Sequence, residues 1–198
     1  MVTKELKNIF LSASVPLPER DPKYIGTADI IAIRDAIIAL TTVVLPHHRI
    51  IWGGHPSITP LIYYVMDKLK LKVQDHVTLY QSEFFKDRFP PDNNKFENVI
   101  LTENLGDIPS SVQRMRERIF SENNFDAAVF IGGMDGIIDE FNMFREYFPE
   151  AFLLPIASTG AATKIVYENL LPDEFKNERL VKDYGYMSLF QKLLIDKI

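Results

Sequence analysis

Short apolar runs alternate along the chain with longer stretches in which apolar residues recur every three or four positions. The short runs are expected to be strands, and they lie at 8–13, 49–52, 76–80, 98–102, 127–131 and 151–155. The longer stretches are expected to be amphipathic helices, of which the segment 28–44 is an example. This alternation predicts an α/β protein with a Rossmann-like, doubly wound and mostly parallel sheet that carries helices on both faces.

Residues with small hydroxyl side chains mark further expected helix starts, at Ser57 or Thr59, at Ser110 or Ser111, and at Ser158. The longest irregular stretch, Gln81–Glu97, has the length of a lid or a wall of a ligand site, and an ordinary surface excursion is an equal alternative. The chain is expected to form one domain over residues 1–198, with a core from about 8 to 170 and a C-terminal helical tail over 172–198.

A Gly-rich segment, Gly132–Gly136, follows the apolar run Ala127–Ile131 and precedes an amphipathic stretch. That order predicts a strand, a turn and a helix. In such a turn the backbone N–H groups can approach a ligand closely, and the helix N-terminus adds a partial positive charge that suits phosphate. A plain connection between a strand and a helix can have the same sequence and is the alternative.

The same arrangement recurs, because four expected strands end in loops of small or glycine residues. The carboxyl ends of parallel strands meet at one edge of a sheet, so these loops are expected to converge on one anionic, nucleotide-like ligand. The candidate ligand-binding residues in them are Ser12, Ala13, Ser14, Gly53, Gly54, His55, Gly132, Gly133, Met134, Asp135, Gly136, Thr159 and Gly160.

Charged candidates follow the Gly-rich turn and precede it. Glu140 lies one helical turn after Gly136 and could accept hydrogen bonds from ribose hydroxyls, or be a surface carboxylate favoured near a helix N-terminus. Arg114, Arg116 and Arg118 lie in one expected helix, with 114 and 118 on a shared face. One of them could donate to a phosphate, and a solvated face is the ordinary alternative.

Composition excludes several classes of function. The formal net charge of −5 gives no electrostatic footprint for nucleic acid, and the absence of cysteine excludes disulfides, thiolate metal sites and thiol catalysis. His47, His48 and His76 lack partners at ligand spacing, so no metal site is expected, and without a Walker or G-x-S-x-G pattern no cofactor is expected either. No signal-peptide pattern and no apolar run of 18 residues is present, which predicts a cytoplasmic protein without a membrane span.

Three segments carry a resemblance to a known family: Phe10–Pro16, Trp52–Pro60 and Phe130–Gly136. With them the chain resembles the SLOG superfamily, which includes the Lonely guy phosphoribohydrolases, the DNA-processing protein DprA, and nucleotide-sensing domains of TRPM channels and antiphage systems. It looks most like a prokaryotic subgroup associated with biological conflict. The resemblance implies a sensor of an ADP-ribose-like or cyclic ADP-ribose-like ligand in bacterial defence signalling.

The enzymatic branch of that superfamily implies an alternative, the hydrolysis of the N-glycosidic bond of a nucleoside monophosphate. Its pattern PGGxGTxxE is preceded by a helix motif that Met115–Arg118 resembles, which makes Arg118 the expected ligand-facing arginine and Glu140 the counterpart of the catalytic glutamate. The chain departs from the pattern, because Ile131 replaces the proline, Ile137 replaces the threonine, and the turn is one residue longer. An assembly protein that retains an old pocket is a third hypothesis.

The resemblance also implies a homodimer or larger oligomer that pairs through helices beside the Gly-rich turn. The helix after that turn is apolar around much of its circumference, at Phe141, Met143, Phe144, Tyr147 and Phe148. The alternative is that the tail covers this patch within one chain, through Tyr184, Tyr186, Met187, Leu189 and Phe190. Phe141, Phe144 and Phe148 are expected to pack on the sheet.

Overall fold

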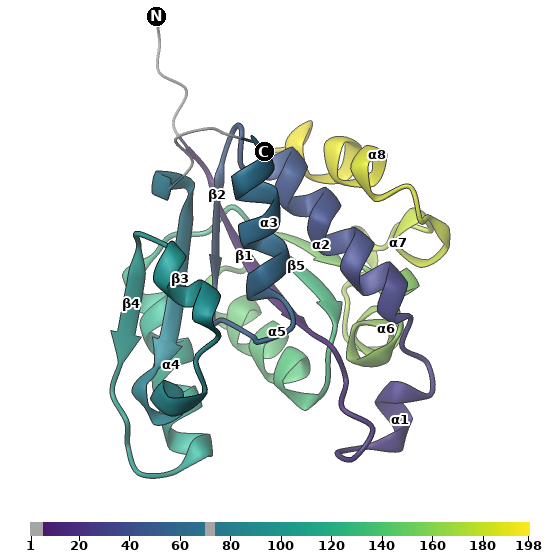
Figure 1. Ribbon diagram of the computed structural model, residues 1–198. Coiled ribbons are helices and arrows are strands. Elements are labelled where there is room, and N and C mark those ends of the chain that lie inside the picture. Colours follow the sequence, from purple (N-terminus) through teal and green to yellow (C-terminus); the bar gives the residue numbers. More distant parts are fainter. Residues whose placement is uncertain (1–5, 70–73) are drawn as a thin grey trace, which may run out of the picture.

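The computed structural model describes residues 6–69 and 74–198 (Figure 1). The strands of this described part form one sheet in the order β4-β3-β2-β1-β5-β6, and every neighbouring pair is parallel. Their bounds are β1 Asn8–Ser14, β2 Arg49–Trp52, β3 Val77–Ser82, β4 Val99–Thr102, β5 Ala127–Gly132 and β6 Phe152–Pro155. The predicted fold class is therefore confirmed, with a sheet that is parallel throughout.

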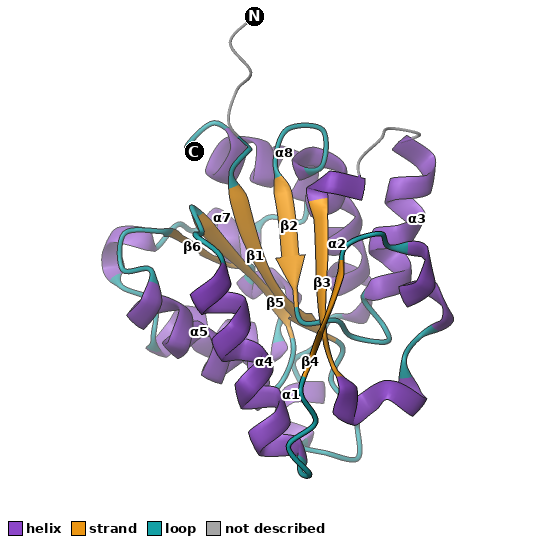
Figure 2. Ribbon diagram, turned by 90° about the vertical axis from the view of Figure 1, so that its left-hand side faces the viewer, coloured by secondary structure: helices purple, strands orange, loops and turns teal. Residues whose placement is uncertain are grey.

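Helices cover both faces of this sheet, as Figure 2 shows. Their bounds are α1 Pro22–Ile25, α2 Ile30–Val44, α3 Thr59–Leu69, α4 Ile108–Glu122, α5 Asp135–Tyr147, α6 Ala161–Asn169, α7 Arg179–Lys182 and α8 Tyr186–Phe190. Shorter turns are the 3-10 helices η1 Gln74–His76, η2 Glu83–Arg88, η3 Pro91–Lys95, η4 Ala157–Thr159 and η5 Asp173–Phe175, and the π-helix η6 Gln191–Ile195. Helices α2, α3 and α8 share a core on one face, and α4 and α5 share a core on the other.

The alternation of side chains along β1 separates these two cores. Ile9 and Leu11 face α2, whereas Phe10 faces α5 and its ring stacks on that of Phe144 at a centroid distance of 5.7 Å. Phe141 and Phe144 are fully buried, so the prediction that they pack on the sheet is confirmed, and Phe148 is partly buried beside them.

Some expected boundaries were wrong for local reasons. Helix α4 begins two residues before Ser110, because the Asp107 carboxylate accepts a hydrogen bond from the Ser110 N–H at 2.8 Å and Pro109 fits the first turn. The stretch 81–97 is not irregular throughout, since Gln81 and Ser82 complete β3 and the helices η2 and η3 follow.

The C-terminal segment packs on α2 rather than on α5 (Figure 1). Leu189, Phe190 and Leu194 are fully buried in the core that α2 shares with the sheet. The hypothesis that the tail covers the apolar patch of α5 is therefore wrong, because the tail lies on the opposite face. No helix in the described part of the chain is long and apolar enough to cross a membrane.

Candidate functional site

Strands β2, β3 and β4 follow one another on one side of β1, and β5 and β6 lie on its other side, so the topological switch point is between β1 and β5. In this architecture ligands bind in the crevice at the carboxyl ends of the strands, at the switch point. Ser14 at the end of β1 pairs with Gly132 at the end of β5, and the Gly133 N–H donates to the Ser14 carbonyl at 2.8 Å. Gly132 and Gly133 have φ of 63° and 77°, a conformation that favours glycine. The Gly-rich turn therefore leads the chain from the centre of the sheet directly into α5.

Free backbone donors lie just beyond these two glycines. The Gly132 N–H already donates to the Thr159 hydroxyl at 3.0 Å, so both glycines shape the turn. The N–H groups of Met134, Asp135 and Gly136 have no acceptor within residues 6–69 and 74–198, and no side chain caps α5. These three donors lie at the positive end of a helix of 13 residues, a position at which an anion can be bound.

A second feature of this site is the carboxylate of Glu140, one turn into α5. Its Oε2 accepts from the hydroxyl of Ser12 at 2.5 Å, and its Oε1 accepts from Nε of Arg116 at 3.1 Å. Ser12 lies near the end of β1, and Arg116 extends from α4, so three elements meet at one carboxyl group. The arrangement fixes Glu140 as an oriented acceptor beside the free N–H groups.

The guanidinium of Arg116 is hydrogen-bonded to the first turns of α5. It also donates to Asp139 Oδ2 and to the Gly136 carbonyl, each at 3.2 Å, and its side chain is only 10% exposed. A methyl group on Gly136 would lie 3.0 Å from the Arg116 Nη2, so glycine leaves room for this contact. Sequence reasoning missed the role of Arg116, which joins α4 to the candidate site.

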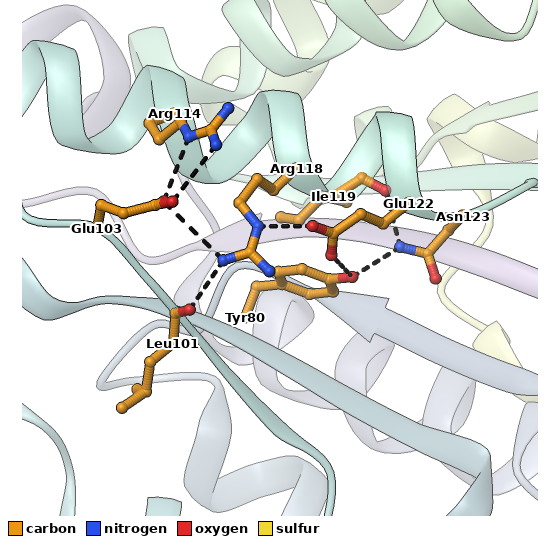
Figure 3. A network of polar contacts seen from close by, with 8 residues as sticks. All are labelled: Tyr80, Leu101, Glu103, Arg114, Arg118, Ile119, Glu122 and Asn123. Atoms are coloured by element: carbon orange, nitrogen blue, oxygen red, sulfur yellow. Dashed lines mark hydrogen bonds and ion pairs between the residues drawn. The ribbon is translucent and has the colours of Figure 1, made fainter.

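Arg118, the arginine that the sequence favoured, lies elsewhere (Figure 3). Its Nε pairs with Glu122 at 2.6 Å, and its Nη1 donates to the Leu101 carbonyl on the edge strand β4 at 3.0 Å. Glu103 links it to Arg114, and the hydroxyl of Tyr80 donates to Glu122. The structure therefore places Arg116, and not Arg118, against Glu140.

The loop after β2 contributes His55. Gly54 before it has φ of 68°, and a methyl group there would lie 1.5 Å from the Gln81 Nε2. The His55 Nδ1 accepts from the Ser57 N–H at 3.2 Å, which leaves Nε2 to carry the proton of the neutral ring. Burial, and secondarily the charge of Arg20, lower the pKa of His55 to about 4. The loop thus presents a neutral imidazole near neutral pH.

Other predicted residues support the turn from behind. Thr159 is fully buried and its hydroxyl donates to the Ile156 carbonyl at 2.6 Å, while a methyl group on Gly160 would lie 1.8 Å from the Thr27 carbonyl oxygen. Gly53 lies against Met115, and Ala13 packs on the core. These residues pack against other parts of the protein, so their contribution is to hold the loops of the candidate site in place.

A segment between β1 and α2 lies across the start of α5. The Tyr24 hydroxyl donates to the carboxylate of Asp135, and Lys23 Nζ lies 3.7 Å from the same carboxylate. Burial, followed by the hydrogen bond to Asp135, raises the pKa of Tyr24, so its hydroxyl remains a donor at neutral pH. Lys23 is shared, because its Nζ lies nearer to the carboxylate of Asp21, at 3.2 Å.

Two surface hollows lie at the opposite edge of the sheet, where the strands begin. They have volumes of about 480 Å³ and about 550 Å³, and none of the predicted site residues lines them. The residues common to both are Lys7 and Asp126. No group of three or more His, Cys, Asp or Glu side chains in the described ranges could hold a metal ion.

The fold and the site together define a Rossmann-like α/β protein with a candidate ligand site at the switch point of its sheet. A model of the SLOG cluster3 family matches residues 23–194, and the chain belongs to this SLOG family. The match extends from α1 into the C-terminal segment and so includes α4, α5 and the Gly-rich turn. No curated protein matches the sequence significantly.

Proposed function

We propose that the protein binds a nucleotide-derived ligand of the ADP-ribose or cyclic ADP-ribose type and acts as a sensor in bacterial defence signalling. Membership of the SLOG family supports binding or processing of a nucleotide-related ligand in general. The observation that carries the proposal is the Glu140 carboxylate, held by Ser12 and Arg116 beside the free N–H groups that open α5.

The chemistry of these groups matches the two polar parts of a nucleotide. A phosphate oxygen accepts from the N–H groups of Met134, Asp135 and Gly136. Each carboxylate oxygen of Glu140 takes one hydrogen bond from the protein and retains lone-pair capacity for a ribose hydroxyl. One ligand then satisfies both features, with its phosphate at the helix terminus and its ribose one turn further along α5.

A sensor also needs a way to report the ligand. We propose that the protein works as a homodimer or larger assembly in the cytoplasm, as the sequence resemblance implies. Phe144 is fully buried, so the contact uses the exposed side of α5, where Tyr147 is 45% exposed. The sensing site and this surface lie on the same helix, so a ligand that shifts α5 would also change the contact between subunits.

A second candidate is a phosphoribohydrolase that uses Glu140. The observation in its favour is the pairing of that carboxylate with a nine-tenths buried arginine at the switch point of the sheet. Arg116 rather than Arg118 would then support the catalytic centre. Each oxygen of Glu140 accepts one hydrogen bond and keeps a further lone pair, which would orient or activate the attacking water.

Thermal shift and product analysis distinguish the two functions. ADP-ribose is expected to raise the midpoint of thermal unfolding, with no base released from a panel of nucleoside monophosphates, and Glu140→Ala is expected to lose the shift. Glu146→Ala, an exposed carboxylate on the same helix, is the matched control and is expected to keep it. Base release that Glu140→Ala abolishes would favour the hydrolase, and no shift with any nucleotide would contradict the sensor.

A further inference from the structure

The sheet ends on one side in β4, an edge strand with an apolar sequence (Figure 1). Its residues Val99–Thr102 are uncharged and rich in β-branched side chains, a composition that favours strand pairing. Leu101 is 44% exposed, and Leu105 and Ile108, which follow the strand, are 52% and 43% exposed. An apolar, exposed edge of this kind is a template on which a strand of another chain can pair.

The backbone groups of Leu101 point away from the sheet. On the inner side of β4, the Leu79 N–H of β3 donates to the Asn98 carbonyl at 2.9 Å. Backbone groups of successive residues in a parallel strand point to opposite sides, so those of Ile100 also face β3 and those of Leu101 face outward. By the same pattern, a residue of a parallel strand added outside β4 would donate to the Leu101 carbonyl and accept from the Glu103 N–H.

Side chains of the protein itself occupy both of these backbone groups (Figure 3). Arg118 Nη1 donates to the Leu101 carbonyl at 3.0 Å and lies 3.9 Å from the carboxylate of Glu103. A hydrogen bond from its own N–H, followed by one from Arg114, lowers the pKa of Glu103. The acceptor and the donor that an added strand would need are therefore already engaged.

The guanidinium of Arg118 is held in this position from the side of α4. Its Nε donates to Glu122 at 2.6 Å, and the other oxygen of that carboxylate accepts from the hydroxyl of Tyr80 at 3.0 Å. Tyr80 is buried, and Asn123 Nδ2 donates to the same hydroxyl at 3.0 Å. The side chain of Arg118 is only 23% exposed, so it reaches the edge strand from an oriented position.

We propose that Arg118, together with Glu103, caps the outer edge of β4 and prevents this strand from pairing with the β4 strand of a second copy of the chain. The inference goes beyond the proposed function, because it concerns neither the ligand nor α5. Without the cap, the Leu101 carbonyl is open beside an apolar surface. The identical strand of a second copy fits this edge, since identical uncharged β-segments pair with one another in register.

The test measures the mass of Arg118→Ala by light scattering, against the wild-type protein and Arg114→Ala at equal concentration. Arg114→Ala is the matched control, because it removes the same charge from α4 and a contact to Glu103 but leaves the Leu101 carbonyl capped. Arg118→Ala is expected to reach about twice the wild-type mass or more, and Arg114→Ala to keep the wild-type mass. Arg118→Lys retains the charge but not the planar fork that joins Glu122 to the Leu101 carbonyl, so it is expected to associate as well. Circular dichroism verifies that each variant is folded.

An engineered cysteine locates the contact, because the chain contains none. Leu101→Cys leaves the backbone carbonyl in place and is expected to form an intermolecular disulfide on oxidation when combined with Arg118→Ala, but not when combined with Arg114→Ala. Folded Arg118→Ala and Arg118→Lys at the wild-type mass would overturn the cap, as would equal association of Arg114→Ala. Association of Arg118→Ala without the disulfide at position 101 would overturn the assignment of β4 as the strand that pairs.

Discussion

At the scale of single residues, the candidate site depends on which face of α4 carries an arginine. Residues 116 and 118 are about 200° apart around a helix, so only one of them can face α5. Arg116 lies on the buried side of α4, together with Met115, Ile119 and Phe120. From this side its guanidinium donates to Glu140. A buried arginine with several acceptors is a stability element as well as a part of the site.

Truncation of Arg116 is therefore expected to cost more than truncation of Arg118. Arg116→Ala leaves the Gly136 carbonyl without this donor and Glu140 with only its hydrogen bond from Ser12, and the free energy of unfolding is expected to fall by about 2–4 kcal/mol. Arg118→Ala removes partly exposed contacts and is expected to cost about 1 kcal/mol or less. Urea denaturation measures both, and equal losses would contradict the difference in their roles.

The choice between these arginines shows how far sequence reasoning reaches. The turn at Gly132 could be predicted, because an apolar run ends there and an amphipathic stretch follows. The partner of Glu140 could not be predicted from spacing, since it depends on how α4 packs beside α5. A signal was present in the periodicity, because Arg116 precedes the buried Ile119 and Phe120 by three and four positions.

His55 makes stability depend on pH in a defined direction. Its pKa is about 4 in the folded protein and 6.5 in the unfolded chain, so between these values the unfolded chain binds the additional proton. The free energy of unfolding is expected to fall as the pH decreases from 6.5 towards 4, by at most about 1.4 kcal/mol per pH unit from this residue. Denaturation across this range should show a smaller slope in His55→Gln, and an unchanged slope would contradict the burial of the ring.

At the scale of elements, the loops at the ends of the strands are built by close packing. The strands and most helices could be predicted from periodicity, because a parallel sheet buried on both faces needs continuous apolar runs such as the six buried residues of β5. The contacts of the loops could not, since Gly54 touches Gln81 and Gly160 touches Thr27, partners that lie far away in the sequence. These glycines are required for the packing of the loops, so contacts with a ligand are expected from neighbouring residues.

Substitutions at two glycines with positive φ distinguish the cost of backbone strain from the cost of a steric clash. Gly106→Ala is expected to cost about 1 kcal/mol, because a methyl group there meets no atom within 4 Å and only the backbone is strained. Gly160→Ala is expected to cost about 2–4 kcal/mol, because the methyl group also collides with the backbone carbonyl of Thr27. Urea denaturation of both variants measures the difference, and similar costs would contradict the packing of this loop.

At the scale of the whole molecule, the question is how the chain associates. One chain has a mass of 22.8 kDa, and light scattering is expected to give at least twice that value. Tyr147→Glu places a charge on the exposed side of α5 and is expected to reduce the mass towards that of one chain, with the circular dichroism spectrum unchanged. Phe144 is not suitable for this test, because its burial makes Phe144→Asp a folding mutation. A monomeric mass at micromolar concentration would contradict the assembly.

The position of the ligand on the molecule is the central claim, and an amide NMR titration with ADP-ribose tests it most directly. The account predicts that the largest chemical-shift changes fall on Met134, Asp135 and Gly136, whose N–H groups have no acceptor in the described structure, with smaller changes at Ser12 and Glu140. Changes confined to Lys7, Asp126 and their neighbours, around the hollows at the opposite edge of the sheet, would contradict it.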